Sequence, residues 1–211
     1  IPARTLRAGA TLAPEFALRN PIRDQIMAGV QSEWGYVPFV DLARGMARAD
    51  LCRFLAACYY QPGPEFAEEK LFDSMQAAAS RVNPDLAAGA RRLGEAFAAE
   101  DPEALLVDYT RLFLGPVDTL AKPYGAIWLR RDNTLMEEST MAVQQLYAEG
   151  GFDIDDGFRE LPDHVAAELE FLYLLIFRET EAQGQGDLDA LAAVTGLRNR
   201  FLAAHLGAWI G

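Results

Sequence analysis

Alanine is the residue type that most constrains how this chain folds. It occurs 35 times among 211 residues, and runs of alternating β-branched residues are almost absent. Alanine has the highest intrinsic helix propensity, whereas a half-buried strand is recognised by a two-residue alternation rich in β-branched and aromatic residues. We therefore predict an all-α fold, a single-domain bundle of about seven to ten helices.

Capping signals indicate where the helices begin and end. At Asp101-Pro102-Glu103, an Asp that can accept hydrogen bonds from the first turn precedes a proline at the first helical position. An apolar stripe at helical spacing follows, and Gly115-Pro116 ends it. The segment from Val165 to Phe177 is apolar nearly all round, which predicts a central helix. Similar signals predict further helices near residues 47–60, 65–80, 84–99, 134–149, 163–183 and 187–208.

The first 45 residues differ from the rest of the chain. They contain four prolines and fewer helix signals, so we interpret residues 1–45 as a partly irregular extension with one helix near 21–31. Residues 46–211 form the all-helical domain. No run of residues is long and apolar enough to span a bilayer, and the start lacks the profile of a secretory signal. We expect a cytoplasmic protein without integral membrane association.

Histidine and cysteine are too scarce for several kinds of site. The two histidines are His164 and His205, and Cys52 and Cys58 are six positions apart in an apolar stretch. Metal sites built on several imidazoles are therefore excluded for a monomer, and the cysteine spacing fits neither a redox pair nor a metal knuckle. We predict no metal, no disulfide and no bound cofactor.

The charge of the chain is unevenly distributed. It has 31 acidic and 19 basic residues, a net charge of −12. Residues 1–50 carry six Arg and five acids, net +1, whereas residues 51–211 carry 13 basic and 26 acidic groups, net −13. Such a body repels nucleic acid and favours a cationic partner. The alternative is that the charge only keeps the protein soluble.

The most acidic stretch surrounds a helix start. Between Glu149 and Glu181 there are ten acidic and two basic residues, net −8, and Pro162-Asp163-His164 opens the long helix. Asp163 is most simply the N-cap, with His164 in the first turn. The pair could also transfer protons, but no motif places a nucleophile beside it. Binding is therefore favoured over catalysis.

Several aromatic residues lie at helical spacing. Tyr109, Leu112 and Phe113 share the stripe of the 101–115 helix, and Tyr124 and Trp128 are four apart just beyond Pro123. The default interpretation for Tyr124 and Trp128 is core packing. His205 lies four positions from both Phe201 and Trp209, so one helical face carries all three, and a packed core or interface histidine is the default there.

Four motifs in order resemble one family. Asp108-Tyr109-Thr110-Arg111-Leu112-Phe113-Leu114-Gly115-Pro116, Pro123-Tyr124-Gly125-Ala126-Ile127-Trp128, the Leu161 to Phe171 run that begins Leu-Pro-Asp-His, and Phe201 to Trp209 with His205-Leu206 look like signatures of the TorD/DmsD/NarJ-like chaperones, the redox enzyme maturation proteins. The resemblance spans about residues 47–209. Its most specific piece is the Pro162-Asp163-His164 opening followed by Glu168-Leu169-Glu170-Phe171.

The resemblance implies a non-enzymatic, cytoplasmic, client-specific chaperone. Such proteins bind the catalytic subunit of a molybdopterin-containing oxidoreductase, often through its twin-arginine leader, during cofactor insertion and before export; these oxidoreductases serve anaerobic respiration. It assigns client binding to Tyr109, Leu112, Phe113, Pro123, Tyr124, Gly125, Trp128, Pro162, Asp163, His164 and Glu168. Two positions depart from the pattern: Asp108 stands where many relatives have Glu, and Ala126 where many have Ser, which removes a hydroxyl.

The charge pattern and the resemblance predict the same kind of ligand. A twin-arginine leader joins a cationic head to an apolar stretch, so its receptor needs carboxylates beside a hydrophobic groove. We expect the partner to be this leader or the client's catalytic subunit and not a nucleic acid, and the chaperone to be a monomer or a homodimer. The alternatives are a helical protein-binding adaptor unrelated to cofactor insertion and a nucleotide-hydrolysing enzyme that uses Asp163 and His164.

Overall fold

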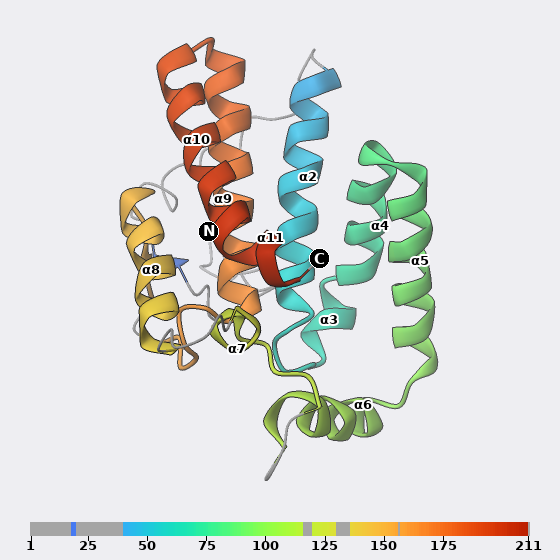
Figure 1. Ribbon diagram of the computed structural model, residues 1–211. Helices are drawn as coiled ribbons and strands as arrows, with labels where there is room; N and C mark the ends of the chain where they lie inside the picture. The colour runs from blue at the N-terminus through green and yellow to red at the C-terminus, as the bar shows by residue number, and fades with distance from the viewer. Residues whose placement is uncertain (1–17, 20–39, 116–119, 130–135, 156, 211) are drawn as a thin grey trace, which may run out of the picture.

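A computed structural model describes residues 18–19, 40–115, 120–129, 136–155 and 157–210. These residues form an all-α bundle, as predicted (Figure 1). The sequence did not predict the one small sheet within them, in which β1 (Leu18–Arg19) pairs antiparallel with β2 (Asp153–Ile154). The extension therefore contacts the body through β1. The helix expected near residues 21–31 lies outside the described residues.

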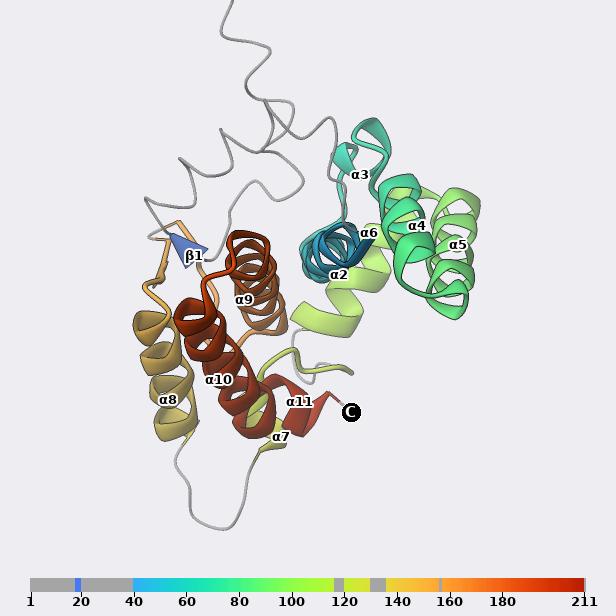
Figure 2. The ribbon, with the colours of Figure 1, turned by 90° about the horizontal axis from the view of Figure 1, so that it is seen from above.

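The helix α9 (Val165–Gln185) is the centre of the bundle, as its apolar sequence predicted. It packs against α2 (Val40–Ala57) on one side and α10 (Leu188–Ala204) on the other, with α8 (Met136–Glu149) beyond α10 (Figure 2). Phe171 and Leu175 of α9 are fully buried, together with Tyr147 and Phe201 from the neighbouring helices. Burial of such side chains is the main favourable contribution to folding.

A second apolar cluster lies on the other side of α2. Its buried side chains come from α2, α3 (Glu65–Glu68), α4 (Leu71–Val82) and α5 (Pro84–Ala99). The single helix expected over residues 65–80 is instead two helices, because Lys70 adopts a left-handed backbone conformation with φ of 54°. The chain turns there, and the turn lets both Phe66 and Leu71 face the same buried cluster.

Two other helix ends follow the local sequence signals. Asp101 caps α6 (Pro102–Tyr109) by accepting hydrogen bonds from the amides of Glu103 and Ala104, as predicted. The helix continues as a π-helical turn, η1 (Thr110–Leu114), and ends before Gly115. Asn83 likewise caps α5 by accepting a hydrogen bond from the amide of Asp85.

The helix predicted for residues 187–208 is interrupted at His205. The backbone of His205, with φ of −127° and ψ of −113°, leaves the helical region. A short helix, α11 (Leu206–Trp209), follows and packs against α7 (Gly125–Trp128), α9 and α10. The interruption changes the direction of the last turn and brings the C-terminal residues to the start of α9. No described helix is long and apolar enough to cross a membrane.

Candidate functional site

Two segments that the sequence singled out lie side by side at the start of α9. The amide of Val165 donates to the carbonyl of Pro123 over 2.8 Å, and the amide of Gly125 donates to the carbonyl of Asp163 over 2.9 Å. Tyr124 pairs with His164 as an isolated antiparallel bridge. The structure therefore joins the 123–128 segment to the Pro162-Asp163-His164 motif, although 37 positions separate Ala126 from Asp163.

Tyr124, His164 and Glu160 form the polar part of this site. The Tyr124 ring meets the His164 ring edge to face, with centroids 5.3 Å apart, and the Tyr124 hydroxyl donates to Glu160 Oε2 over 2.6 Å. Burial lowers the pKa of His164 to about 4, against the opposing charges of Glu160 and Asp163. The imidazole is therefore neutral at pH 7, when it can accept or donate hydrogen bonds.

The structure corrects the prediction that Asp163 caps α9. The cap is His164, whose Nδ1 accepts a hydrogen bond from the amide of Ala166 over 3.2 Å. The Asp163 carboxylate is fully buried and points the other way, where Oδ2 accepts a hydrogen bond from the amide of Ala126 over 2.8 Å. The reason is that His164, with ψ of 136°, is the last extended residue before the helix.

The end of α6 belongs to the same side of the molecule. The Tyr109 hydroxyl donates to the carbonyl of Tyr59 over 3.1 Å, and the Phe113 ring lies against both tyrosines, with centroid distances of 5.1 Å to Tyr109 and 6.0 Å to Tyr59. Burial and then the nearby charge of Glu160 raise the pKa of Tyr109. Tyr109 is therefore within electrostatic range of Glu160 and Tyr124, and Phe113 packs on Tyr109.

Apolar side chains around this site are exposed. Trp128, which the sequence assigned by default to the core, exposes 58% of its surface, while its indole donates to the carbonyl of Lys122 over 2.9 Å. Leu112 exposes 39%, and its carbonyl accepts a hydrogen bond from the amide of Ala121. Further exposed residues on α6, η1 and the adjoining loops are Leu106, Val107, Leu114, Leu120 and Leu161. A contiguous apolar patch is typical of an interaction surface, and Leu112 and Trp128 are brought together here by their hydrogen bonds to the consecutive residues Ala121 and Lys122.

Pro162 anchors the site to the core. Its carbonyl accepts a hydrogen bond over 2.8 Å from the hydroxyl of Tyr147, a buried residue of α8. The loop before α9 is therefore held from behind, so that its outer side keeps one shape. A surface that is fixed before binding loses less conformational entropy when a ligand arrives.

Glu168 lies beneath the site and is fully buried. Its Oε2 accepts a hydrogen bond from the indole of Trp209 over 3.0 Å. Burial raises the pKa of Glu168 to about 8, opposed by the Trp209 hydrogen bond and supported by the charge of Asp163. The sequence placed Trp209 on a face with His205 but gave no sign of this pairing, because 41 positions separate Glu168 from Trp209.

The acidic stretch around α9 does not form a continuous rim. Of its described carboxylates, Asp163, Glu168 and Glu170 are buried, and Glu149 and Glu179 are ion-paired with Arg200 and Arg198. The acidic residues are not gathered on one surface as expected, because α9 runs through the centre of the bundle and its acidic side chains face different neighbours. Glu160 is the exposed member of the stretch that contacts the site residues.

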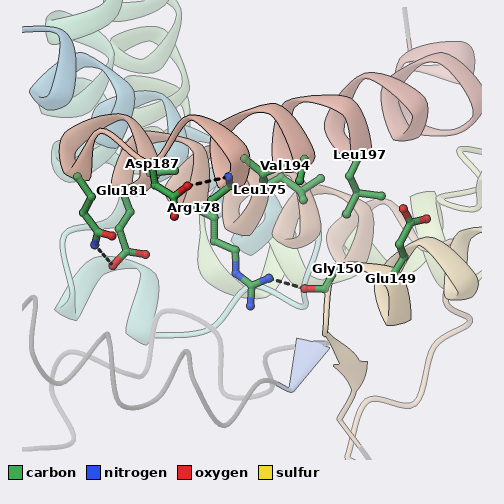
Figure 3. A pocket seen from close by; sticks show the side chains of 12 residues that line it. Glu149, Gly150, Leu175, Arg178, Glu181, Asp187, Val194 and Leu197 are labelled. Atoms are coloured by element: carbon green, nitrogen blue, oxygen red, sulfur yellow. Dashed lines mark hydrogen bonds between the residues drawn. The ribbon is translucent and has the colours of Figure 1, made fainter.

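A separate cavity lies at the other end of α9, between α8, α9 and α10 (Figure 3). Its volume is about 510 Å³. Arg178 reaches across it to the carbonyl of Gly150 and stacks over the Phe152 ring at 4.2 Å, and Asp187 caps α10 beside it. None of the residues predicted for client binding lines this cavity.

Comparison with known proteins identifies the family. Residues 80–211 match the family model described as nitrate reductase delta subunit. Chaperone protein TorD of Vibrio parahaemolyticus is 26% identical over 106 residues, which are 50% of this chain and 48% of TorD. Tat proofreading chaperone DmsD of Salmonella typhi is 34% identical over 73 residues, which are 35% of this chain and 36% of DmsD.

The chain spans about half the length, or less, of the curated relatives it matches. A crystal structure assigned to a redox enzyme maturation protein of Archaeoglobus fulgidus covers 80% of this chain and 98% of that chain at 18% identity. Its TM-score of 0.39 is too low to support an argument about the fold. The family model matches more than half of the chain, and the protein therefore belongs to the nitrate reductase delta subunit family, in agreement with the motifs that resemble TorD/DmsD/NarJ-like chaperones.

Proposed function

We propose that this protein is a cytoplasmic, client-specific chaperone for a molybdopterin-containing oxidoreductase. It binds the catalytic subunit before export and holds the twin-arginine leader of that subunit while the cofactor is inserted. Chaperone names among the relatives, TorD and the Tat proofreading chaperone DmsD, support this class of function. The observation that carries the proposal is the exposed apolar surface around Trp128 and Leu112, beside the Tyr124 and Glu160 pair.

The apolar stretch of the leader supplies most of the binding free energy. It packs on the exposed Leu112 and Trp128 and on the partly buried Phe113; the Leu112 carbonyl is held by the amide of Ala121, and the Trp128 indole by the carbonyl of Lys122. Large aromatic side chains at the centre of an interface contribute the most to affinity. A partly exposed tryptophan held by its own indole hydrogen bond loses little conformational freedom on binding.

The cationic head of the leader meets Glu160. This carboxylate is exposed, and the Tyr124 hydroxyl fixes its position. One fixed, exposed carboxylate orients a guanidinium and speeds the encounter, while its contribution to affinity is modest. Pro123, Gly125, Pro162, Asp163 and His164 hold the backbone on which these contacts depend.

An enzymatic function for the Asp163 and His164 pair has less support. The Asp163 carboxylate is fully buried and bonded to a backbone amide, and His164 Nδ1 is occupied as a helix cap. Burial raises the pKa of both cysteine thiols to about 12, so that neither is a thiolate nucleophile at neutral pH. A helical adaptor unrelated to cofactor insertion would differ from the chaperone in its ligand: it would not bind the leader of a molybdopterin oxidoreductase.

The test is calorimetric titration with the synthetic leader peptide of a molybdopterin oxidoreductase encoded beside this protein. A peptide of the same composition in scrambled order is the control ligand. Trp128→Ala should weaken binding by about 30-fold, or roughly 2 kcal/mol, because it removes an aromatic anchor. Leu188→Ala is the matched control variant, since Leu188 is an exposed apolar residue at the start of α10. Equal affinity for leader and scrambled peptide would refute leader recognition.

A further inference from the structure

The cavity between α8, α9 and α10 contains an arginine whose hydrogen bonds are only partly made. Arg178 donates from Nη1 to the carbonyl of Gly150, and its guanidinium lies over the Phe152 ring, 4.2 Å from the centroid. Among the described residues, no acceptor is bonded to its Nε or Nη2, and no carboxylate lies within ion-pair distance. Neither nitrogen is fully enclosed by protein, so both are open to a ligand.

The rest of the cavity is mostly apolar. Its volume of about 510 Å³ is within the range of small-molecule pockets. The apolar lining residues on α9 and α10 are Leu175, Ala182, Ala190, Ala193, Val194 and Leu197. A ligand that fills this space therefore needs an apolar body, with one polar group placed to meet Arg178.

Three carboxylates at the cavity limit the charge that a ligand can carry. Glu149 is ion-paired with Arg200, and Asp187 Oδ1 accepts a hydrogen bond from a backbone amide as the N-cap of α10. Glu181 carries the remaining negative charge, and Figure 3 shows its carboxylate apart from the guanidinium of Arg178. Burial lowers the pKa of Arg178, opposed by the charge of Glu181. One added negative charge beside Arg178 is compensated there, whereas a second is repelled by these carboxylates.

We propose that this cavity binds a monocarboxylate with an apolar body, and that the carboxylate pairs with Nε and Nη2 of Arg178. These two nitrogens form one edge of the guanidinium, which matches the two oxygens of a carboxylate in parallel hydrogen bonds. The Gly150 carbonyl and the Phe152 ring hold the guanidinium before the ligand arrives, so that little side-chain freedom is lost on binding. The apolar body packs on the small side chains of α10, and its burial supplies the rest of the binding free energy.

This site is independent of the proposed function. None of the residues assigned to client binding lines the cavity, so either proposal can fail without the other. The ligand would contact α9, α10 and the end of α8 together, and it should therefore also stabilise the folded protein against heat.

The test compares three probes that share one straight alkyl chain and differ in the head group. Decanoate, decanol and decylamine are titrated calorimetrically into the full chain, each below the concentration at which it forms micelles. We expect decanoate to bind most tightly and decylamine most weakly. Arg178→Gln should weaken decanoate binding about tenfold or more and change decanol binding little, because it removes a charged hydrogen-bonding partner. Arg92→Gln, at an exposed arginine of α5, is the matched control and should change neither.

A second variant tests the body of the cavity. Ala193→Phe fills the space from an exposed position of α10 and keeps Arg178, and it should abolish the binding of both decanoate and decanol. With the wild-type probe comparison, it decides the proposal even if Arg178→Gln fails to fold. An apolar tripeptide with a free C-terminus, compared with its C-terminal amide, distinguishes a peptide carboxylate from a free acid as the source of the same group.

Three results would overturn the proposal. The first is no binding of decanoate, and the second is decylamine binding as tightly as decanoate, because the acidic side chains would then select the head group. The third is decanoate binding that is unchanged in Arg178→Gln or in Ala193→Phe, which would place the ligand outside this cavity.

Discussion

The pH dependence of folding stability is expected to report the buried Glu168 carboxyl. Its pKa is about 8 in the folded protein against an ordinary value of 4.5, so the folded state keeps a proton that the unfolded state has lost. Stability from this group is complete below pH 4.5 and falls as the pH rises toward 8. The slope is about 1.4 kcal/mol per pH unit wherever only the folded state is protonated.

His164 contributes with the opposite sign in a different range. Its pKa is about 4 in the folded protein against 6.5, so the unfolded state binds the extra proton and stability rises with pH between these values. The pKa of His205 is also lowered from 6.5, so its contribution has the same sign and is nearly complete about one pH unit above that value. Between pH 4.5 and 6.5 the contribution of Glu168 to stability falls with pH while those of His164 and His205 rise. Between pH 6.5 and 8 the Glu168 contribution changes the most of the three.

Between pH 6.5 and 8 the contribution of Glu168 to stability falls by roughly 1.5 kcal/mol, after allowing for its own titration near pH 8, and the two histidines offset part of this fall. With an m-value of about 2 kcal/mol/M, the Glu168 contribution alone lowers the urea midpoint by roughly 0.7 M. Urea unfolding at three pH values in this range measures it. Glu168→Gln cannot titrate, and its profile should be flatter than that of the wild type by the same amount. Parallel profiles for the two proteins would refute the assignment of a raised pKa to Glu168.

Three further predictions follow from other contacts. Gly125→Ala should destabilise the protein by about 1–3 kcal/mol in urea unfolding, because the added Cβ would press on Trp209 and Glu168. Its control is Gly196→Ala, in an open position of α10, which should stabilise the protein by up to about 1 kcal/mol. Asp101→Ala should cost about 1 kcal/mol through loss of two cap hydrogen bonds, and Asp108→Ala, an exposed acid on the same helix, should cost less than half as much. Glu160→Gln should weaken leader binding about two- to fivefold and reduce its salt dependence; an unchanged salt dependence would place the interacting charge elsewhere.

Local sequence signals predicted the helices where the chemistry that sets a boundary is itself local. Asp101 and Asn83 cap helices because a short polar side chain precedes a proline, and no distant contact is needed. The central position of α9 also follows from its sequence, since a helix apolar nearly all round is stable only when it is surrounded. Lys70 shows the limit, because nothing in the residues around it requires a left-handed turn.

The cap of α9 shows how a distant partner overrides a local preference. Asp is normally a better cap than His, and the Pro162-Asp163-His164 sequence therefore favours Asp163. The amide of Ala126 offers the Asp163 carboxylate a buried donor from another segment, and His164 takes the cap instead. The pairing of Glu168 with Trp209 is of the same kind. It depends on the interruption of the last helix at His205, which the helical spacing of Phe201, His205 and Trp209 argued against.

The distribution of the acidic residues changes the expected balance of forces in ligand binding. A net charge of −8 over one stretch suggested recognition by a rim of carboxylates, yet the structure buries some of them and pairs others with α10. Buried carboxylates shape the site from within, and ion-paired ones offer little to a ligand. What the site presents outward is an apolar surface with Glu160 at its edge. Affinity at such a surface depends mainly on apolar burial, and the remaining negative charge of the body acts on solubility and on the rate of encounter with a cationic partner.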